Sequence, residues 1–310
     1  MTPRLIVENA GSLATLQDLG RRGHASIGVG ISGAVDRASH NRANRLVGNL
    51  STAATVEVTL GGLVARATGR MDIAVTGADV DVDVDGVRHP PDARIRVRTG
   101  QRITVPTPRT GLRNYLAVRG GFDAQPILGS RSTDTLARLG PDPLGPGDVL
   151  TVGRDWGPYP LIDHIPRPTS HHRDLPVLLY VPGPRDDWFT EGAHAALCRS
   201  QWVVSPSSNR VGVRLLGPPL ERATQGELPS EGVVTGAIQV PPAGPIVFLD
   251  DHPVTGGYPV IGVVERDSLD RLAQARAGEL VVFRPLSRSG SEFGRPVERP
   301  STRSGRAAER

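Results

Sequence analysis

The stretch that decides the fold runs from Thr15 to Asn49 and reads TLQDLGRRGHASIGVGISGAVDRASHNRANRLVGN. Residues 17–36 show neither the 3.6-residue period of an amphipathic helix nor the alternation of a strand. Polar side chains stand between glycines, which permit tight turns and close approach of backbone to a ligand or to another segment. The stretch therefore predicts either an ordered loop that caps buried backbone or a polar site formed by a loop and a helix start.

The helix start in this stretch is Asp36. Its carboxylate can accept the free amide protons of the next turn, so we expect a helix from Arg37 to about Val47. Gly48 would follow the last helical turn and end it. The inner face of this helix is predicted to carry Ala43, Leu46 and Val47.

Beyond this helix, the chain reads as mainly β. Segments such as Thr55–Leu60 and Ala93–Arg98 alternate apolar and polar residues, and turn signals recur between them, as in a barrel or sandwich. Glu57 lies on the face opposite Val56 and Val58, which is either the side of a site or the solvent side. Three more short helices are expected, over Thr135–Leu139, Asp187–Leu197 capped by Asp186, and Ser268–Ala275.

One acidic run fits two structures. Asp81, Asp83, Asp85 and Asp92 have the spacing of a calcium loop, which would need a helix on each side. Both flanks read as strand, and Asp85-Gly86 is a strong hairpin turn. We therefore expect a hairpin, and no metal site anywhere in the chain.

Composition excludes several classes of function. All 36 basic residues are arginine, so a Walker A lysine or a Schiff-base lysine is excluded. Aromatic residues make up only 4%, too few for a nucleic-acid stacking platform, and no apolar run approaches the length of a membrane helix. The only cysteine is Cys198, and the first residues lack a signal sequence. We expect a cytoplasmic protein that binds neither nucleic acid nor membrane.

Domain boundaries follow from proline and arginine content. A length of 310 residues suggests two domains. The predicted organisation is an N-terminal β-barrel domain over residues 1–158, a proline-rich linker over 159–175 and a C-terminal barrel over 176–286. Residues 287–310, rich in Arg, Ser, Gly and Pro, are predicted to form a disordered basic tail.

Several motifs together resemble a known family. TLQDLGR, GVGISGAVD and ANRLVGN in the opening stretch are similar to the signature of the allophanate hydrolase subunit 2 family, which includes KipA, the C subunit of 5-oxoprolinase and the carboxyltransferase domain of urea carboxylase. The resemblance extends in order over about residues 4 to 284. Its further motifs are TVEVTLGG with Glu57, TGA at Thr76–Ala78, GSRSTD at Gly129–Asp134, PGPRDDWF at Pro182–Phe189, SPSSNRVGVRLLG at Ser205–Gly217, SEGVVTGAIQVPPAGPI at Ser230–Ile246 and TGGYPVIGVV at Thr255–Val264.

This resemblance implies two cyclophilin-like β-barrel domains and three alternative functions. The first is a subunit of an ATP-dependent amide or lactam hydrolase, most simply 5-oxoprolinase, inactive without a B-type partner (KipI-like, allophanate hydrolase subunit 1) and working with an A-type subunit. The second is the carboxyltransferase component of a biotin-dependent urea carboxylase or allophanate system. The third is a KipA-like regulator that binds a kinase inhibitor.

The candidate site combines loops of both domains, since clefts between domains are common ligand sites. Arg210 would bind an anionic group and Gln239 an amide, with the Gly256 and Gly257 backbone close by. His252 stands near the place where the family carries a glutamine, and is either a substitute for it or a structural histidine. The predicted catalytic residues are Asp18, Arg21, Asp36 and Arg210, and the predicted substrate-binding residues are Gln17, Ser32, Glu57, Arg131, Gln239, Thr255, Gly256, Gly257 and Tyr258. Alternatively, each polar cluster only stabilises its own barrel.

Overall fold

The computed structural model describes residues 2–166, 175–226 and 228–286. The predicted basic tail and residues 167–174 of the predicted linker lie outside this part of the chain. The described residues are mainly β with three short α-helices, so the predicted fold class is confirmed. The helices are α1 (Arg37–Leu46), α2 (Glu191–Arg199) and α3 (Arg266–Leu272), and the 3-10 turns are η1 (Ala25–Ile27) and η2 (Asp186–Trp188).

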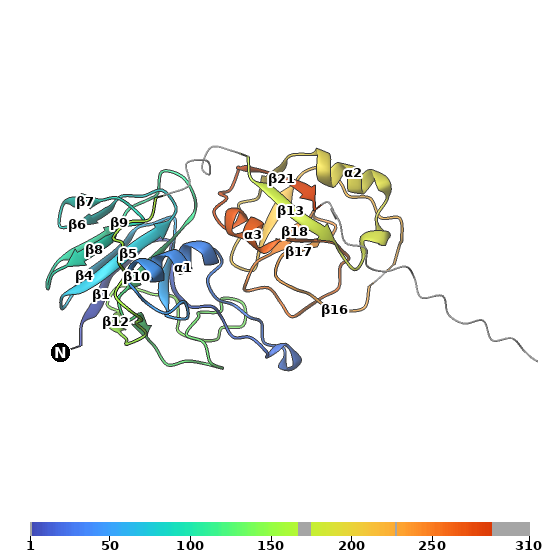
Figure 1. Cartoon of the computed structure of the whole chain (residues 1–310). Coiled ribbons are helices and arrows are strands. Elements are labelled where there is room, and N and C mark those ends of the chain that lie inside the picture. The colour runs from blue at the N-terminus through green and yellow to red at the C-terminus, as the bar shows by residue number, and fades with distance from the viewer. Residues whose placement is uncertain (1, 167–174, 227, 287–310) are drawn as a thin grey trace, which may run out of the picture.

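The N-terminal part, residues 2–166, is built from two sheets (Figure 1). Buried valines and leucines from both sheets form one shared core. The seven-stranded sheet has the order β11 (Phe122–Asp123), β12 (Val149–Val152), β1 (Arg4–Ala10), β4 (Leu63–Ala67), β9 (Arg102–Val105), β6 (Val82–Val84), β7 (Val87–His89), and the five-stranded sheet has the order β2 (Leu13–Gln17), β3 (Thr55–Thr59), β10 (Arg113–Val118), β5 (Met71–Gly77), β8 (Arg94–Val97).

Helix α1 covers the outer face of the five-stranded sheet. Asp36 caps it as predicted, because its carboxylate accepts from Ser39 N at 2.8 Å. Gly48 follows its end with φ of 68°, a left-handed conformation that favours glycine. Its predicted inner residues, Ala43, Leu46 and Val47, pack in a small buried cluster. The other members of this cluster are Ala34, Ala74, Tyr115 and Ala117.

The C-terminal part, residues 175–286, contains a closed barrel (Figure 1). Trp202 and Phe283 lie at the centre of its core. Val35, from the loop before α1, belongs to the same buried cluster, so the two parts share apolar contact. Around the barrel the order is β13 (Val177–Pro182), β20 (Val260–Val264), β17 (Ala237–Gln239), β18 (Ile246–Phe248), β15 (Gly212–Leu216), β14 (Trp202–Val204), β21 (Leu280–Pro285); β16 (Glu231–Gly232) and β19 (Thr255–Gly256) form a separate ribbon.

Three local expectations need correction. Residues 135–138 form a turn rather than a helix, because Asp134 and Leu139 pair across it and Arg138 takes a φ of 53°. The helix expected from Asp187 is split into η2 and α2, since Thr190 is extended and its hydroxyl caps α2 by accepting from Ala193 N at 3.1 Å. Helix α3 begins at Arg266, before the expected Ser268, and ends at Leu272.

Two further features bear on the sequence predictions. The predicted hairpin at Asp85-Gly86 is present, with Val84 paired to Val87. Residues of the predicted linker lie against the N-terminal part, since Ala93 and His164 form a bridge and Ile165 N donates to Asp92 O at 2.9 Å. Within the described ranges, no helix is both long and apolar enough to cross a membrane.

Candidate functional site

The centre of the candidate site is Arg210, in the loop between β14 and β15. Its side chain is only 2% exposed and every guanidinium nitrogen donates to the protein. Nε and Nη2 each donate to Asp251 at 3.0 Å, Nη2 also donates to Gly33 O at 2.7 Å, and Nη1 donates to Glu57. Burial acts to lower the pKa of Arg210, but the charges of Asp251 and then Glu57 outweigh it, so the pKa lies above its ordinary value. Arg210 therefore joins the two parts of the chain through paired charges.

Glu57 supplies the N-terminal side of this contact. The alternation of β3 sends Val56 and Val58 into the sheet core and Glu57 toward the C-terminal part, where it is buried rather than exposed to solvent. Tyr115 Oη donates to Glu57 Oε2 at 2.8 Å, and Arg113 Nε lies 3.5 Å from Oε1. Burial acts to raise the pKa of Glu57, but Arg210 and Arg113 outweigh it, so the pKa lies below its ordinary value. Glu57 is thus an ionised, buried partner of two arginines.

Asp251 closes the same network from the C-terminal part. Ser32 Oγ donates to its Oδ1 at 2.8 Å, and the Thr135 amide and hydroxyl donate to Oδ2 at 3.0 and 2.7 Å. Burial acts against ionisation, yet Arg210 lowers the pKa of Asp251. Ser32 has a φ of 55°, and its amide donates to Asp250 O at 2.8 Å, which ties the unusual backbone to the other part of the chain.

A second cluster surrounds Asp18, entirely within the N-terminal part. Asp18 accepts from the Ser130 and Ser132 hydroxyls at 2.6 Å each and from Arg131 N at 2.6 Å. A carboxylate that accepts from several donors orders the segment that provides them. The two polar motifs predicted from the sequence, TLQDLGR and GSRSTD, therefore meet at this carboxylate.

Arg21 and Gln17 hold the same segment from its other side. Arg21 is buried, donates to Ser132 O and lies 3.6 Å from Asp134. Gln17 Nε2 donates to Thr133 O at 2.9 Å. Within the described residues, Gln17 Oε1 is buried without a hydrogen-bond partner, so it is the atom of this cluster that could accept from a bound water or ligand.

Asp36 lies outside these clusters and makes a further contact between the two parts. Besides capping α1, it accepts from Gln274 Nε2, in the segment after α3, at 2.7 Å. Nearby, Asp270 accepts from Arg37 N at 2.9 Å. Burial and then the negative charge of Asp36 raise the pKa of Asp270 to about 7.

Asp250 completes this contact next to Asp251. Arg37 Nη2 and Arg266 Nη1 approach it at 2.7 and 3.0 Å. Burial nevertheless raises the pKa of Asp250, although Arg266 and Arg37 act to lower it. The interface between the two parts of the chain is therefore rich in buried, paired charges.

The predicted TGGY loop forms a third cluster. Gln239 Nε2 donates to Tyr258 O at 3.1 Å. Thr255 and Gly256 are in β19, where a Cβ on Gly256 would lie 2.3 Å from Gln239 Nε2. Gly257 follows directly, and Tyr258 is exposed. No hydrogen bond among the described residues joins the Gln239 side chain to the Arg210 network.

His252 lies between the Arg210 network and this loop. Its Nδ1 is 2.7 Å from Pro253 O, a carbonyl that can only accept, so Nδ1 carries a proton and Nε2 is the ring nitrogen that is able to accept. Nε2 is buried and has no hydrogen-bond partner within the described ranges. The Gly30 backbone, from the N-terminal part, packs against the His252 carbonyl. His252 is therefore placed to accept a hydrogen bond at the junction of the two parts.

The Arg131 side chain takes no part in these clusters, although its amide donates to Asp18. Its Nε donates to Ala124 O at 3.0 Å and its Nη1 lies 3.5 Å from Asp155. The structure thus unites Arg210, Glu57 and Ser32 and collects Asp18, Arg21 and Gln17 in an adjacent cluster. The side chains of Asp36 and Arg131 lie outside both groups, although their amides donate to Tyr115 and Asp18, and the Gln239 loop is separate. Among described residues, no three His, Cys, Asp or Glu side chains gather as a metal site.

Three acidic residues that pair with Arg37, Arg210 or Arg266 were not among the predicted site residues, namely Asp250, Asp251 and Asp270. The signal available was the dipeptide Asp250-Asp251, directly after the apolar run of β18 and Leu249 and before a glycine-rich loop. Two adjacent buried carboxylates need cations from elsewhere in the fold. The full set of residues that take part in these contacts and were not predicted from the sequence is Arg37, Arg113, Tyr115, Asp250, Asp251, Arg266, Asp270 and Gln274.

Comparison with known proteins confirms the family expected from the motifs. The family model for the carboxyltransferase domain, subdomain A and B, matches residues 27–285. The 5-oxoprolinase C subunit of Escherichia coli is 36% identical over 289 residues, covering 90% of each chain, and that of Haemophilus influenzae is 33% identical, covering 89% of each. Urea amidolyase of Saccharomyces cerevisiae is 31% identical, but the match spans only 16% of its length.

Solved structures agree with this assignment. Urea amidolyase of K. lactis has a TM-score of 0.86 at 30% identity, over 93% of this chain and 19% of that chain. Urea carboxylase of Kluyveromyces lactis has a TM-score of 0.86 at 29% identity, over 93% of this chain and 28% of that chain. The protein is thus a member of the carboxyltransferase domain, subdomain A and B, family.

Proposed function

We propose that this chain is the C-type subunit of an ATP-dependent 5-oxoprolinase, which acts with a B-type and an A-type subunit to open 5-oxoproline to glutamate. The observation that carries the proposal is the extent of the matches. Two bacterial 5-oxoprolinase C subunits match over 90% and 89% of their own length, whereas the urea enzymes match over 16% to 24% of theirs. The matched region is thus nearly the whole of a 5-oxoprolinase C subunit but only a fraction of a urea enzyme.

The proposed substrate site is the junction of His252 with the Gln239 loop. A lactam presents one N–H donor and one carbonyl acceptor on a planar ring. His252 Nε2 is a buried acceptor for the N–H, and the Gln239 amide lies beside Gly256, where backbone can approach the ring. The Arg210 network would position these loops rather than contact the lactam, because its donors are already occupied.

ATP is proposed to bind to the partner subunit. The buried arginines around the candidate site do not fit a triphosphate, since Arg210 and Arg113 are paired with Glu57 and Asp251. The carboxylate of Asp250 would repel phosphate at the same interface. We therefore assign no step of phosphoryl transfer to residues of this chain.

The test is ADP release by the purified chain with its B-type partner and A-type subunit, with 5-oxoproline, urea or no substrate. Stimulation by 5-oxoproline alone supports the proposal. His252→Ala should lower that stimulation by at least about tenfold, as expected for loss of a polar contact to substrate. His194→Ala, a half-buried histidine on α2, is the matched control and should retain it.

The second candidate is a carboxyltransferase of a biotin-dependent urea carboxylase. It is favoured by the TM-score of 0.86 with the Kluyveromyces lactis urea carboxylase. Biotin would then be supplied by a separate protein, since the chain has no lysine to carry it. Urea-dependent consumption of carboxybiotin, without any response to 5-oxoproline, would favour this candidate over the first.

A further inference from the structure

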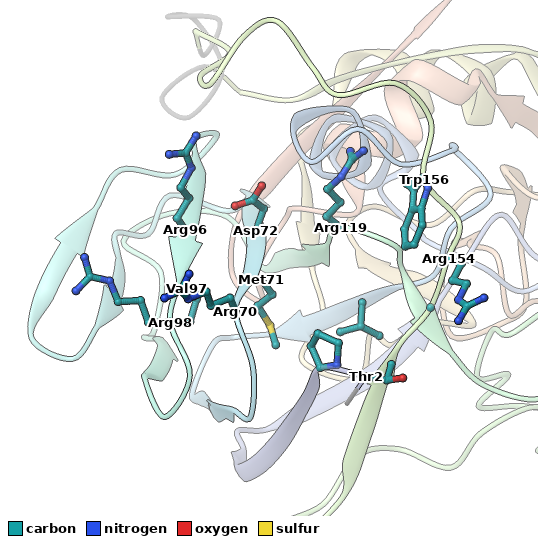
Figure 2. Close-up of a pocket in the computed structure, with 13 residues that line it drawn as sticks. Thr2, Arg70, Met71, Asp72, Arg96, Val97, Arg98, Arg119, Arg154 and Trp156 are labelled. Carbon is teal, nitrogen blue, oxygen red and sulfur yellow. The ribbon is translucent and has the colours of Figure 1, made fainter.

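A hollow of about 1200 Å³ opens on the N-terminal part, separate from the Arg210 network. Its lining comes from the first residues of the chain, the start of β5, the end of β8 and the segments after β10 and β12 (Figure 2). Five arginines line it, against one acidic residue, Asp72, which already accepts from Tyr159 Oη. The hollow is therefore strongly basic. These arginines are Arg70, Arg96, Arg98, Arg119 and Arg154.

Most of these arginines lack a carboxylate partner in the part of the chain that the structure describes. Arg70, Arg96, Arg98 and Arg154 are exposed, and within the described residues none of these four pairs with a carboxylate. Three other exposed arginines of the N-terminal part do have acidic partners. Arg66 and Arg102 both contact Glu8 at 2.7 Å, and Arg109 contacts Asp79 at 2.8 Å.

One wall of the hollow is held rigidly. Arg119 donates to Val47 O at 2.8 Å, and its guanidinium lies 4.6 Å from the centre of the Tyr159 ring. Arg94 lies 4.5 Å from the same ring centre. Such stacking fixes planar cations in place, so this wall is preorganised for a partner.

One large, exposed apolar side chain lines the hollow with the arginines, and two more are exposed further along the same segment. Trp156 lines the hollow with half of its surface exposed, and Leu161 and Ile162 follow in the same segment with exposed side chains. Tryptophan and arginine are enriched among the residues that dominate protein interfaces, while clustered exposed apolar groups mark contact surfaces. The combination is typical of a site that binds protein.

We propose that this hollow receives an acidic segment of the B-type subunit. The inference rests on the proposed function, which requires such a partner. Its volume exceeds the roughly 300–1,000 Å³ usual for small-ligand sites. Arg96, Arg98 and Arg154 point in different directions around the rim, so an extended chain of Asp and Glu can reach them where a compact anion cannot (Figure 2).

The experiment measures the affinity of the purified B-type subunit for the full chain by calorimetry, at two salt concentrations. The test variant is Arg96→Glu with Arg98→Glu, and the second is Trp156→Ala. The matched control is Arg214→Glu with Arg284→Glu, which reverses two exposed strand arginines of the C-terminal barrel. Thermal melting checks that every variant is folded.

The test variant should bind at least tenfold more weakly than wild type and lose much of its salt dependence, while the control stays within twofold. If the complex forms and both hollow variants bind like wild type, the docking site is wrong while the proposed function stands. If the wild-type chain forms no complex, the proposed function fails and the docking site with it. Binding of ATP to the wild type but not to the test variant, with the complex unaffected, would assign the hollow to a nucleotide instead.

Discussion

Arg210 of the C-terminal barrel donates to Glu57 of the N-terminal sheet, and both side chains are almost completely buried. The pair crosses the junction of the two parts and is completed by Asp251 and Arg113. Burying ions is costly unless each is paired, so the two parts can pack together only in the arrangement that matches these charges. This match also places His252 against the Gly30 backbone of the N-terminal part.

Replacing Arg210 tests that relationship. Arg210→Ala leaves Glu57 and Asp251 buried without their cation, and should reduce the free energy of unfolding by about 3–5 kcal/mol. Chemical denaturation measures it, with the exposed Arg214→Ala as the control. In combination with Glu57→Gln the losses should be clearly less than additive. A stable, fully active Arg210→Ala protein would refute the structural role given to this pair.

Asp18 should prove essential to the order of the Ser130–Asp134 segment. Asp18→Asn puts an amide where the carboxylate accepts from two hydroxyls and a backbone N–H, and should cost at least about 2 kcal/mol. Hydrogen exchange of the Arg131 and Ser132 amides should become faster. Asp142→Asn, an exposed carboxylate in the loop that follows, should leave both quantities unchanged. Unaltered exchange in Asp18→Asn would show that the cluster does not hold the segment.

Asp270 should make stability depend on pH. Its pKa is raised from an ordinary 3.8 to about 7 by burial and by Asp36. Between these values the folded protein binds more protons than the unfolded chain, so this group's contribution is present at low pH and is lost as the pH rises through about 7. Asp270→Asn removes the titration. The Tm of wild type minus that of the variant should fall from pH 4 to pH 8, and a flat difference would contradict the assignment.

Gly256 tests the role of the Gln239 loop. A Cβ at Gly256 would meet Gln239 Nε2 at 2.3 Å, so Gly256→Ala must turn the glutamine away from Tyr258 O. Gly232 lies in the paired strand with open space around its Cα, and Gly232→Ala is the matched control. We expect Gly256→Ala to raise the KM for 5-oxoproline at least about tenfold, with little change in Tm. Equal KM values for the two variants would show that Gln239 does not contribute to substrate binding.

Local signals in the sequence sufficed for part of this structure. Asp36 and Gly48 correctly predicted the two ends of α1, and Asp85-Gly86 correctly predicted the hairpin between β6 and β7. Capping and turn formation depend on residues that are close in sequence. The same logic failed at Thr135. Asp134 does accept from Leu136 N and Ala137 N, as a cap would, but its pairing with Leu139 closes a turn.

The candidate site shows the same limit. Arg210 and Glu57 could be selected by residue type and motif, yet nothing local indicates that they bond to each other across the two parts of the chain. The pairing depends on which acids and bases the fold buries together. The roles of Asp250 and Asp251 as ion-pair partners can be recognised only in the folded structure. Likewise, the unpartnered Nε2 of His252 is a property of packing that residue type alone does not provide.

The most direct test of the proposed function is conversion of labelled 5-oxoproline to glutamate by the B-type and A-type subunits with ATP, with and without this chain. Glutamate should form only when all three proteins are present, and His252→Ala should slow its formation. Equal glutamate formation with this chain omitted, or none with all three proteins folded and present, would contradict its assignment as the C-type subunit.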